Sequence, residues 1–424
     1  MKIKYQEKSF EDILSYSPKK SKKPKKPSKF RRFLLKTVSK SDLKDTNFTY
    51  NLNDVSTLKI DEPILILMNH SSFIDLEIAS TIFYPRPLNI VTTTDGFIGK
   101  NWLLRNLGCV PAKKFILDVE LVRNLLYVTK KLKSSILMYP EASYSFSGQT
   151  TPLPESVGKF IKLLNIPVVT VITENAFLRQ PLYNMLYKHE VKVSANAKIL
   201  INKDEIKTLS TKEINERLKK EFQLDYWKTQ KEHNVIIKED NFAEGLERVL
   251  YKCPHCGTEG EISTTKNNIK CNKCGVTYEI QPTGELVALN ATTKFSSVSS
   301  WYDYEREEVR KEILNGTYKT EFDPTLFVTL DTYKLFKVKD VNPHFVHDIN
   351  GFSLTDEEHN LSFKLNPQET YSVYSDFYWY EIGDVISIGN TDIQYYCFPE
   401  GKRVSVAKIR IASEEMFKLK NNTK

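Results

Sequence analysis

The segment PILILMNHSSFIDLEIAS, residues 63–80, changes character halfway along. Its apolar residues 64–68 predict a buried β-strand. The polarity then reverses at Asn69 and His70, and Asp75 follows the histidine by five residues, across a predicted strand-to-helix turn. Polar side chains at the end of a strand in an α/β fold lie where functional sites gather. The segment therefore predicts both a central strand and a candidate site.

His70 and Asp75 form a candidate acid–base pair. A histidine titrates near neutral pH, and a carboxylate bonded to its far ring nitrogen fixes the tautomer and stabilises the imidazolium. The alternative is purely structural, with His70 at a helix cap and Asp75 in the first helical turn, where a negative charge favours the macrodipole. The segment by itself leaves both interpretations open.

The chain around this segment alternates between apolar runs and helix-like stretches. This alternation predicts an α/β fold, a mixed sheet with helical cover. The predicted strands are 64–68, 88–94, 109–115, 134–140 and 167–173, and the predicted helices are 76–84, 101–108, 119–133, 156–165 and most of 204–233.

Three later stretches carry polar residues beside apolar strands. GCVPAKKF, residues 108–115, brings Lys113 and Lys114, and SSILMYPEASYSFSG, residues 134–148, brings Glu141 and several hydroxyls. NIPVVTVIT, residues 165–173, opens a strand with a proline. Together with residues 63–80 they make four blocks in a fixed order.

These four blocks resemble those of the glycerolipid acyltransferase family, in particular the 1-acylglycerol-3-phosphate acyltransferases, over roughly residues 40–230. The Asn-His-x4-Asp block is intact as Asn69, His70 and Asp75. Gly108 and Lys114 stand in the second block, where the family has Gly and Arg. The third block, Phe-Pro-Glu-Gly-Thr-Arg-Ser in the family, reads Tyr139, Pro140, Glu141, Ala142, Ser143, Tyr144 and Ser145 here, and Pro167 anchors the fourth.

The resemblance implies acyl transfer from acyl-CoA or acyl-acyl-carrier protein to a lysophospholipid hydroxyl, with 1-acylglycerol-3-phosphate as acceptor and phosphatidic acid as product. His70 would be the general base, oriented by Asp75. A Ser–His hydrolase built on Ser71 or Ser72 is disfavoured because no GxSxG elbow surrounds them. Glu141 would organise the site, or else cap a helix. The expected substrate-binding residues are Asn69, Lys113, Lys114, Glu141, Ser143 and Ser145.

Two departures from the family pattern concern the acceptor's phosphate. Tyr144 replaces an arginine, and Lys114 keeps the charge of an arginine without its planar fork. An alternative is therefore a catalytically inactive acyltransferase-like protein that binds lipid, nucleic acid or a partner. The intact His70, Asp75 and Glu141 count against it.

Four of the six cysteines form two Cys-x2-Cys pairs separated by 14 residues. Four thiolates at this spacing predict a structural, tetrahedral zinc site in a zinc ribbon, with His255 outside the ligand set. We expect the ribbon to pack or to dock a protein partner, and not to bind nucleic acid, because it has few lysines and no aromatic platform. The ligands are Cys253, Cys256, Cys271 and Cys274.

The net charge of +8 is concentrated near the N-terminus. Residues 19–36 hold ten Lys or Arg and no acid, so the other residues sum to −2 (+8 minus 10). Phe30, Phe33, Leu34 and Val38 follow at helical spacing, which fits either a helix on an anionic membrane or one docked on the next domain. No apolar run reaches the roughly 18–20 residues that span a bilayer. We expect a cytoplasmic protein, peripheral on the inner face of the cell membrane.

The predicted organisation has four parts. Residues 1–40 form the basic arm and amphipathic segment, 41–245 the acyltransferase domain, 246–289 the zinc ribbon and 290–424 a β-rich C-terminal domain. In the last part a helix-like piece precedes strand-like runs that end with VSVAKIRI, residues 404–411, and a terminal helix. We find no catalytic constellation there, and the C-terminal domain is a second candidate surface for a protein partner.

Overall fold

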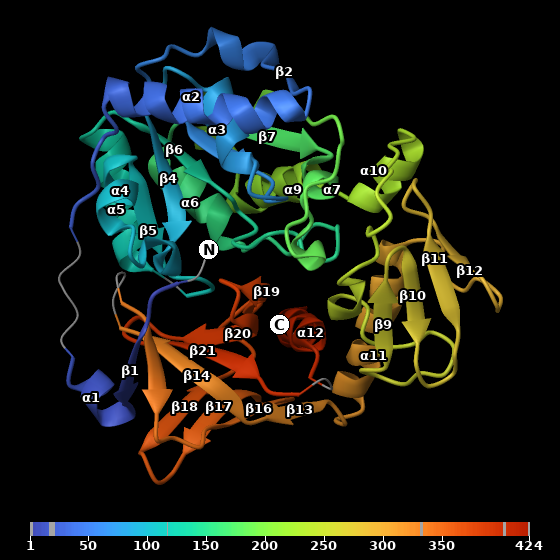
Figure 1. Cartoon of the computed structure of the whole chain (residues 1–424). Coiled ribbons are helices and arrows are strands. Elements are labelled where there is room, and N and C mark those ends of the chain that lie inside the picture. The colour runs from blue at the N-terminus through green and yellow to red at the C-terminus, as the bar shows by residue number, and fades with distance from the viewer. Residues whose placement is uncertain (1–2, 17–21, 117, 331–333, 402–403, 423–424) are drawn as a thin grey trace.

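The computed structural model describes residues 3–16, 22–116, 118–330, 334–401 and 404–422. Figure 1 shows an α/β domain above, a small yellow β-domain at one side and an orange-to-red β-domain below, with helix α12 between them. One continuous apolar cluster includes side chains from all three parts. The three parts therefore pack against one another.

A seven-stranded sheet with the order β2-β8-β7-β3-β6-β4-β5 forms the centre of the α/β domain. Neighbouring strands are parallel except for β7 and β8, so the mixed sheet expected from the sequence is confirmed. The strands are β2 (Thr49–Asn51), β3 (Leu65–Met68), β4 (Leu88–Thr93), β5 (Cys109–Ala112), β6 (Ser135–Met138), β7 (Val168–Glu174) and β8 (Ser194–Ile201).

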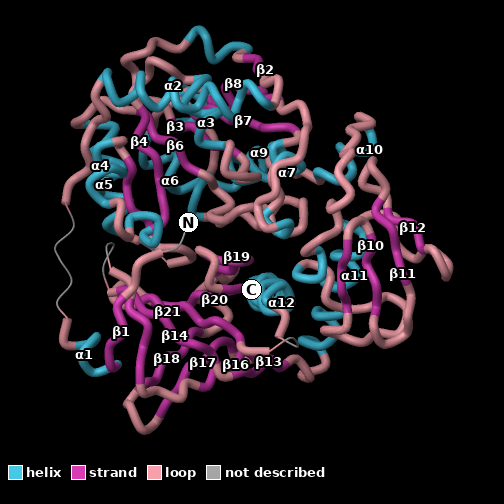
Figure 2. Tube along the Cα trace, in the orientation of Figure 1, coloured by secondary structure: helices cyan, strands magenta, loops and turns pink. Residues whose placement is uncertain are grey.

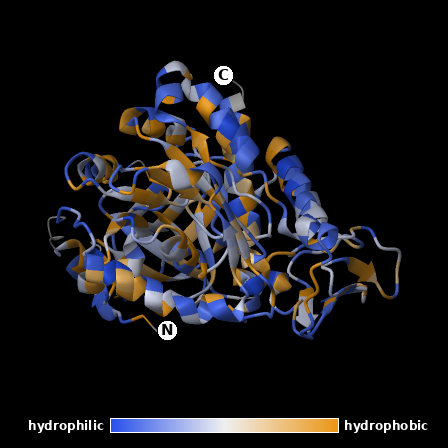
Figure 3. Cartoon of the chain, turned by 90° about the horizontal axis from the view of Figure 1, so that it is seen from above, coloured by the Kyte–Doolittle hydropathy of each residue, from blue (hydrophilic) through white to orange (hydrophobic). Residues whose placement is uncertain are grey.

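Helices cover both faces of this sheet. Ile66 and Met68 of β3 belong to an apolar cluster that includes residues of α3, whereas Leu65 and Leu67 belong to a second cluster with α5, α6 and α9. A strand buried on both faces reads as a continuous apolar run, which explains residues 64–68. In Figure 3 orange segments gather towards the middle of the molecule, and the helices at its edge show both blue and orange. The helices of this domain are α2 (Lys29–Asp45), α3 (Asp75–Ile82), α4 (Asn101–Asn106), α5 (Val119–Lys130), α6 (Ser156–Leu164), α7 (Ala176–Arg179), α8 (Lys203–Thr208), α9 (Thr211–Glu221) and α10 (Tyr226–Glu232), and the 3-10 turns are η1 (Asn53–Thr57), η2 (Thr94–Phe97) and η3 (Leu182–Asn184).

The small β-domain follows turn η4 (Leu246–Arg248) and is an antiparallel sheet with the order β12-β11-β10-β9. It stands apart as a compact group of strands in Figure 2. Its strands are β9 (Ile262–Thr265), β10 (Asn268–Cys271), β11 (Thr277–Ile280) and β12 (Leu286–Ala288).

The C-terminal domain contains two sheets, with the orders β1-β15-β14-β21-β20-β19 and β13-β16-β17-β18. Its β-rich character is as expected, and helix α11 (Val298–Leu314) leads into it. The strands are β13 (Lys319–Phe322), β14 (Pro324–Thr329), β15 (Phe336–Lys339), β16 (His344–Asp348), β17 (Gly351–Asp356), β18 (Leu361–Leu365), β19 (Tyr374–Trp379), β20 (Gly383–Gly389) and β21 (Gln394–Pro399).

Two parts of this domain differ from the sequence prediction. Strand β1 (Gln6–Ser9), followed by α1 (Phe10–Leu14), pairs in parallel with β15, so the N-terminus joins the C-terminal sheet. The strand predicted at residues 404–411 is wrong, because helix α12 (Val406–Asn422) already begins there. The alternation of polarity in these residues does not reflect a strand, because α12 is buried on nearly every side and even its Arg410 is only 2% exposed.

The described part of the basic arm, residues 22–28, is extended and lies on the α/β domain. Its backbone accepts hydrogen bonds from Arg105 Nη1 (2.8 Å) and Asn89 Nδ2 (2.9 Å). Pro27 is buried against Gly108, where a Cβ would meet Leu88 O at 2.8 Å and Pro27 Cδ at 2.9 Å. Gly108 also has a φ of +92°, so its place in the second block has a structural reason. Residues 17–21 of the arm lie outside the described residues.

Candidate active site

His70 and Asp75 meet across the turn between β3 and α3. His70 Nδ1 lies 3.0 Å from Asp75 Oδ2, and the same oxygen accepts the backbone N–H groups of Ser71 (2.7 Å) and Ser72 (3.1 Å). Three donors on one oxygen favour the ionised carboxylate and a proton on Nδ1 of the ring. His70 Nε2 is then the nitrogen with a free lone pair.

Burial sets the protonation of this pair. It lowers the pKa of His70 below the ordinary value of 6.5, and the nearby Lys114 adds to this, while the bond to Asp75 opposes it. Burial raises the pKa of Asp75, and the hydrogen bonds to its carboxylate oppose that rise. At neutral pH His70 is therefore a neutral imidazole, which is the form that accepts a proton.

Two tyrosines enclose the His70 ring. Tyr139 stacks on it at a centroid distance of 3.9 Å, and Tyr144 lies over it at 3.8 Å. Burial raises the pKa of both phenols well above the ordinary value, so they stay neutral. Tyr144, which stands where the resembling family has an arginine, thus packs against the imidazole, a contact that the sequence did not reveal.

Glu141 joins the two loops beneath the histidine. Its Oε1 accepts the backbone N–H of His70 (3.3 Å), and its Oε2 accepts both the N–H (3.2 Å) and the hydroxyl (3.1 Å) of Thr151. Burial raises the pKa of Glu141 to about 7. The next residue, Ala142, has a φ of 56°, in the left-handed region that a glycine adopts more easily.

Asn69 and Ser145 have protein partners as well. Asn69 Nδ2 donates to Tyr226 OH (2.7 Å), and its Oδ1 accepts the N–H of Thr173 (2.8 Å), which ties the end of β3 to β7. Ser145 Oγ donates to Gln149 O (2.8 Å). Neither residue lines the cavity beside His70, and nor does Glu141. The contacts of these three residues hold the loops that follow β3 and β6 in place.

A cavity of about 920 Å³ opens beside His70. Lys113, Lys114 and Ser143 line it, together with His70, so these predicted residues come together at one space. Its volume lies within the range usual for small-molecule sites. Apolar side chains from α5, α6 and β4 complete the wall on the α/β side; these include Leu121, Val122, Leu125, Val157, Phe160, Ile90 and Val91.

The opposite wall comes from the C-terminal domain, which the sequence did not connect with the site. Tyr371, Tyr374 and Asp376 from β19 and the segment before it line the cavity, as does Phe417 of α12. The run YSVYSDFYWY, rich in tyrosine, marks this wall in the sequence, but nothing local tells which domain it faces.

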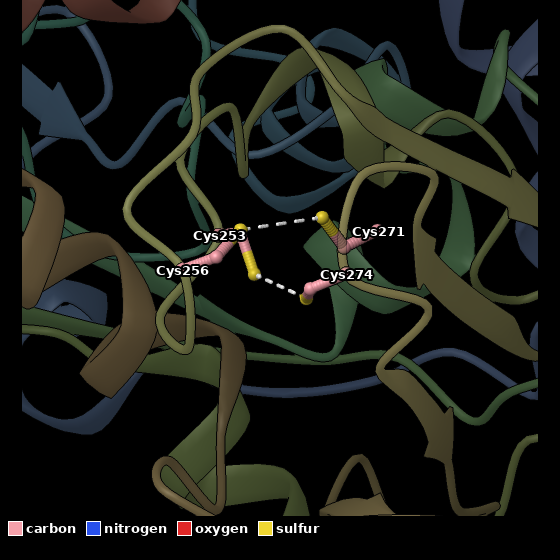
Figure 4. Close-up of side chains that lie close together, drawn as sticks. All are labelled: Cys253, Cys256, Cys271 and Cys274. Atoms are coloured by element: carbon pink, nitrogen blue, oxygen red, sulfur yellow. Dashed lines mark hydrogen bonds between the residues drawn. The ribbon is translucent and has the colours of Figure 1, made fainter.

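The four cysteines of the ribbon converge on one point (Figure 4). Their sulfur atoms lie within 4.8 Å of one another, with Cys253–Cys274 at 3.7 Å and Cys256–Cys271 at 3.8 Å. Tetrahedral zinc–thiolate bonds of about 2.3 Å place sulfurs roughly 3.8 Å apart, so the cluster fits zinc. His255 Nε2 lies 3.0 Å from Tyr278 OH, which is consistent with a role outside the ligand set.

One comparison with known protein families matches the part of the chain that holds His70 and Asp75. Residues 47–174 match the family model described as Acyltransferase. This part of the chain, less than half of its length, is similar to an acyltransferase domain. It contains His70, Asp75, Glu141 and the strands that carry them.

A search of solved structures finds the 1-acyl-sn-glycerophosphate (LPA) acyltransferase PlsC from Thermotoga maritima, at 15% sequence identity and a TM-score of 0.34. The alignment covers 44% of this chain and 78% of that one. No curated protein matches the chain.

Proposed function

We propose that this protein transfers a fatty acyl group from an acyl thioester, acyl-CoA or acyl-acyl-carrier protein, to a hydroxyl of a lysophospholipid. The observation that carries the proposal is the His70–Asp75 pair at the wall of a 920 Å³ cavity, inside the acyltransferase domain. Because the four sequence blocks resemble those of the 1-acylglycerol-3-phosphate acyltransferases, 1-acylglycerol-3-phosphate, which would give phosphatidic acid, is the reference acceptor for any assay.

The reaction follows from the state of His70. Its Nε2 takes the proton of the acceptor hydroxyl as the oxygen attacks the thioester carbonyl, and the C–O bond forms. The tetrahedral oxyanion collapses, the C–S bond breaks, and the imidazolium returns its proton to the leaving thiolate. Asp75 stabilises the imidazolium between these two events. The acceptor is itself the nucleophile, so no acyl-enzyme is needed.

Neither neighbouring serine has a hydroxyl bonded to His70, and within the described residues the Ser72 hydroxyl has no hydrogen-bond partner. Ser71 Oγ lies 2.8 Å from Tyr226 OH and accepts the side-chain amide of Asn69 (2.8 Å). A nucleophilic serine would need its hydroxyl bonded to His70 instead. The arrangement supports direct transfer over a Ser–His hydrolase.

The decisive experiment replaces His70. Purified His70→Ala protein should lose about a hundred- to ten-thousandfold in kcat with acyl-CoA and a lysophospholipid, because the general base is removed. Circular dichroism and thermal melting would serve as the folding control, and His233→Ala, on a histidine outside the cavity lining, as the matched variant. Near-normal turnover by His70→Ala would refute the mechanism. A wild-type protein without turnover would favour the alternative of an inactive binding module.

The same proposal includes a place for the protein on an anionic membrane surface. Helix α2 packs on α3, yet Phe30 (72%), Phe33 (54%) and Val38 (66%) remain exposed. Lys29 and Lys40 are exposed on the same helix. Apolar side chains among basic ones are the pattern of a helix at a lipid interface. Within the described residues, no helix combines the length and the hydropathy needed to cross a bilayer.

A double substitution tests this surface. Phe30→Ser with Phe33→Ser should weaken binding to vesicles of phosphatidylcholine and phosphatidylglycerol by about tenfold or more, because two apolar contacts are lost. Point substitutions are preferable to a truncation, because β1 belongs to the C-terminal sheet. Leu314→Ser, at an exposed leucine of α11, is the matched control. Equal vesicle binding by the double variant and the control would rule out α2 as the membrane contact.

A further inference from the structure

The C-terminal wall of the cavity is fixed relative to His70. Arg410 of α12 donates from Nη2 to Ser143 Oγ (3.0 Å), within the loop that follows β6. Phe377 of β19 stacks on Phe146 at 3.8 Å between centroids. Trp379 Nε1 donates to Asp95 Oδ2 (3.2 Å). These contacts are largely buried, so the two walls form one preorganised site.

This wall engages both lysines expected to hold a phosphate. Lys113 Nζ donates to the backbone carbonyl of Thr391. Lys114 Nζ lies 3.0 Å from the centroid of the Tyr374 ring; burial lowers the pKa of Lys114, and the carboxylates of Asp95 and Asp376 oppose this. Each ammonium therefore already has a partner from the C-terminal domain.

The other charges that line the cavity are negative, and Arg410, which lies behind Ser143, is paired with Glu414. The described lining contains four carboxylates, two ammonium groups and no arginine. A phosphate monoester carries about 1.5 to 2 negative charges at pH 7, so it would meet an excess of like charge here. The carboxylates are Asp118, Glu155, Glu369 and Asp376, and the ammonium groups are Lys113 and Lys114.

Asp376 is the carboxylate best placed to recognise an acceptor. It lines the cavity at β19 and accepts the hydroxyl of Tyr374 at 2.6 Å, which fixes its orientation. Burial raises its pKa to about 6, and Lys114 opposes this, so it remains mostly ionised at neutral pH. A carboxylate beside tyrosine rings attracts hydroxyl and ammonium donors.

We infer that the acyl acceptor has a head group that donates hydrogen bonds to Asp376, through hydroxyls or an ammonium, and that it is not a phosphate monoester. This inference rests on the proposed function and specifies its substrate. The acyltransferase domain then supplies the base, and the C-terminal domain selects the head group. Lysophosphatidylglycerol represents the hydroxyl form of this chemistry and lysophosphatidylethanolamine the ammonium form.

The test compares acceptors on the full-length protein. With one acyl-CoA and matched acyl chains, kcat/KM should be at least about tenfold higher for lysophosphatidylglycerol or lysophosphatidylethanolamine than for 1-acylglycerol-3-phosphate. The better of the two identifies the donor as hydroxyl or ammonium. Asp376→Asn should raise KM for the preferred acceptor about tenfold with little change in kcat. The ratio of kcat/KM for this acceptor to kcat/KM for 1-acylglycerol-3-phosphate should therefore fall. Glu358→Gln, an exposed carboxylate outside the cavity lining, is the matched control.

A binding measurement separates this inference from the mechanism. His70→Ala protein should bind the same acceptors without turning them over, and calorimetric titration should show the same order of affinity. Tighter binding of 1-acylglycerol-3-phosphate, or an unchanged preference in a folded Asp376→Asn protein, would overturn the inference. Absent turnover with the predicted order of binding would reject the proposed reaction and leave the head-group assignment standing.

Discussion

The two walls of the cavity are built from differently spaced parts of the sequence. On the α/β wall, the base and its carboxylate come from seven consecutive residues, 69–75, in which backbone and side chains hold His70 and Asp75 together. The facing wall comes from residues 369–376 and from α12, about 300 positions further along the chain. The first is a local turn, whereas the second exists only after the C-terminal domain has packed on the first.

The difference separates two tasks within one site. Proton transfer depends on a geometry of a few ångströms that a short turn can fix. Acceptor choice depends on the charge and shape of the facing wall, which can change without moving the base. Damage to the first wall should therefore appear in kcat, and damage to the second in the KM for the acceptor.

After the loss of His70 itself, the largest expected effect comes from Asp75. An Asp75→Asn protein keeps the size of the side chain but loses the charge that stabilises the imidazolium, and it can stabilise the wrong tautomer of His70. We expect kcat to fall about a hundredfold or more, with a small change in the acceptor KM. Steady-state kinetics at saturating acyl-CoA would measure this. A rise in KM with unchanged kcat would contradict the proposal that the wall with the base controls kcat and the facing wall controls KM.

The pH dependence should separate the walls further. His70 must be neutral to act, and its pKa is lowered, so kcat should hold steady down to a value below pH 6.5 and then fall about tenfold per pH unit. Asp376 must be ionised to accept a donor, and its pKa of about 6 predicts that the acceptor KM rises as pH falls through 6. In Asp376→Asn the effect on KM should disappear while the effect on kcat remains. If Asp376→Asn abolished the pH dependence of both kcat and KM, a single titrating group would account for both.

The same contrast explains what the sequence could predict. Residues 63–80 encode their strand, turn and helix locally, so the mixed sheet of the α/β domain was predicted correctly. The apolar runs of β4 to β7 are similarly local signals. The His70–Asp75 contact needed only the assumption of a tight turn.

The rest depends on contacts between distant segments. Tyr139 and Tyr144 read as ordinary aromatics until both rings are seen against His70. The β1–β15 pairing joins residues more than 300 positions apart, and nothing in residues 6–9 indicates a partner. Residues 404–411 alternate in polarity like a strand. The segment is buried on nearly all sides, so its hydrophobic periodicity does not distinguish a helix from a strand.

The smallest expected effect concerns how the ribbon supports the second wall. Glu259, three residues after Cys256, pairs with Lys408 of α12 (2.8 Å). Glu259 also pairs with Lys252, and Lys408 also pairs with Glu312 near the end of α11. If the four cysteines bind zinc, the metal fixes the turn from which Glu259 extends. Loss of the metal should loosen the start of α12, which carries Arg410 to Ser143. We expect about one zinc per chain by mass spectrometry, and about a fivefold rise in the acceptor KM after chelation, since a partly exposed ion pair contributes at most about 1 kcal/mol.

Two variants sharpen this last prediction. Lys408→Met keeps the ribbon and its metal but removes the link, so it should reproduce the rise in KM with full zinc content. Cys256→Ser should lose zinc and lower the melting temperature as well, because the ribbon itself is destabilised. Restoring zinc after chelation should reverse the effect in wild-type protein but not in Lys408→Met. If kcat falls in these variants while KM stays constant, the ribbon acts on the wall that carries His70, and the division of tasks between the walls is wrong.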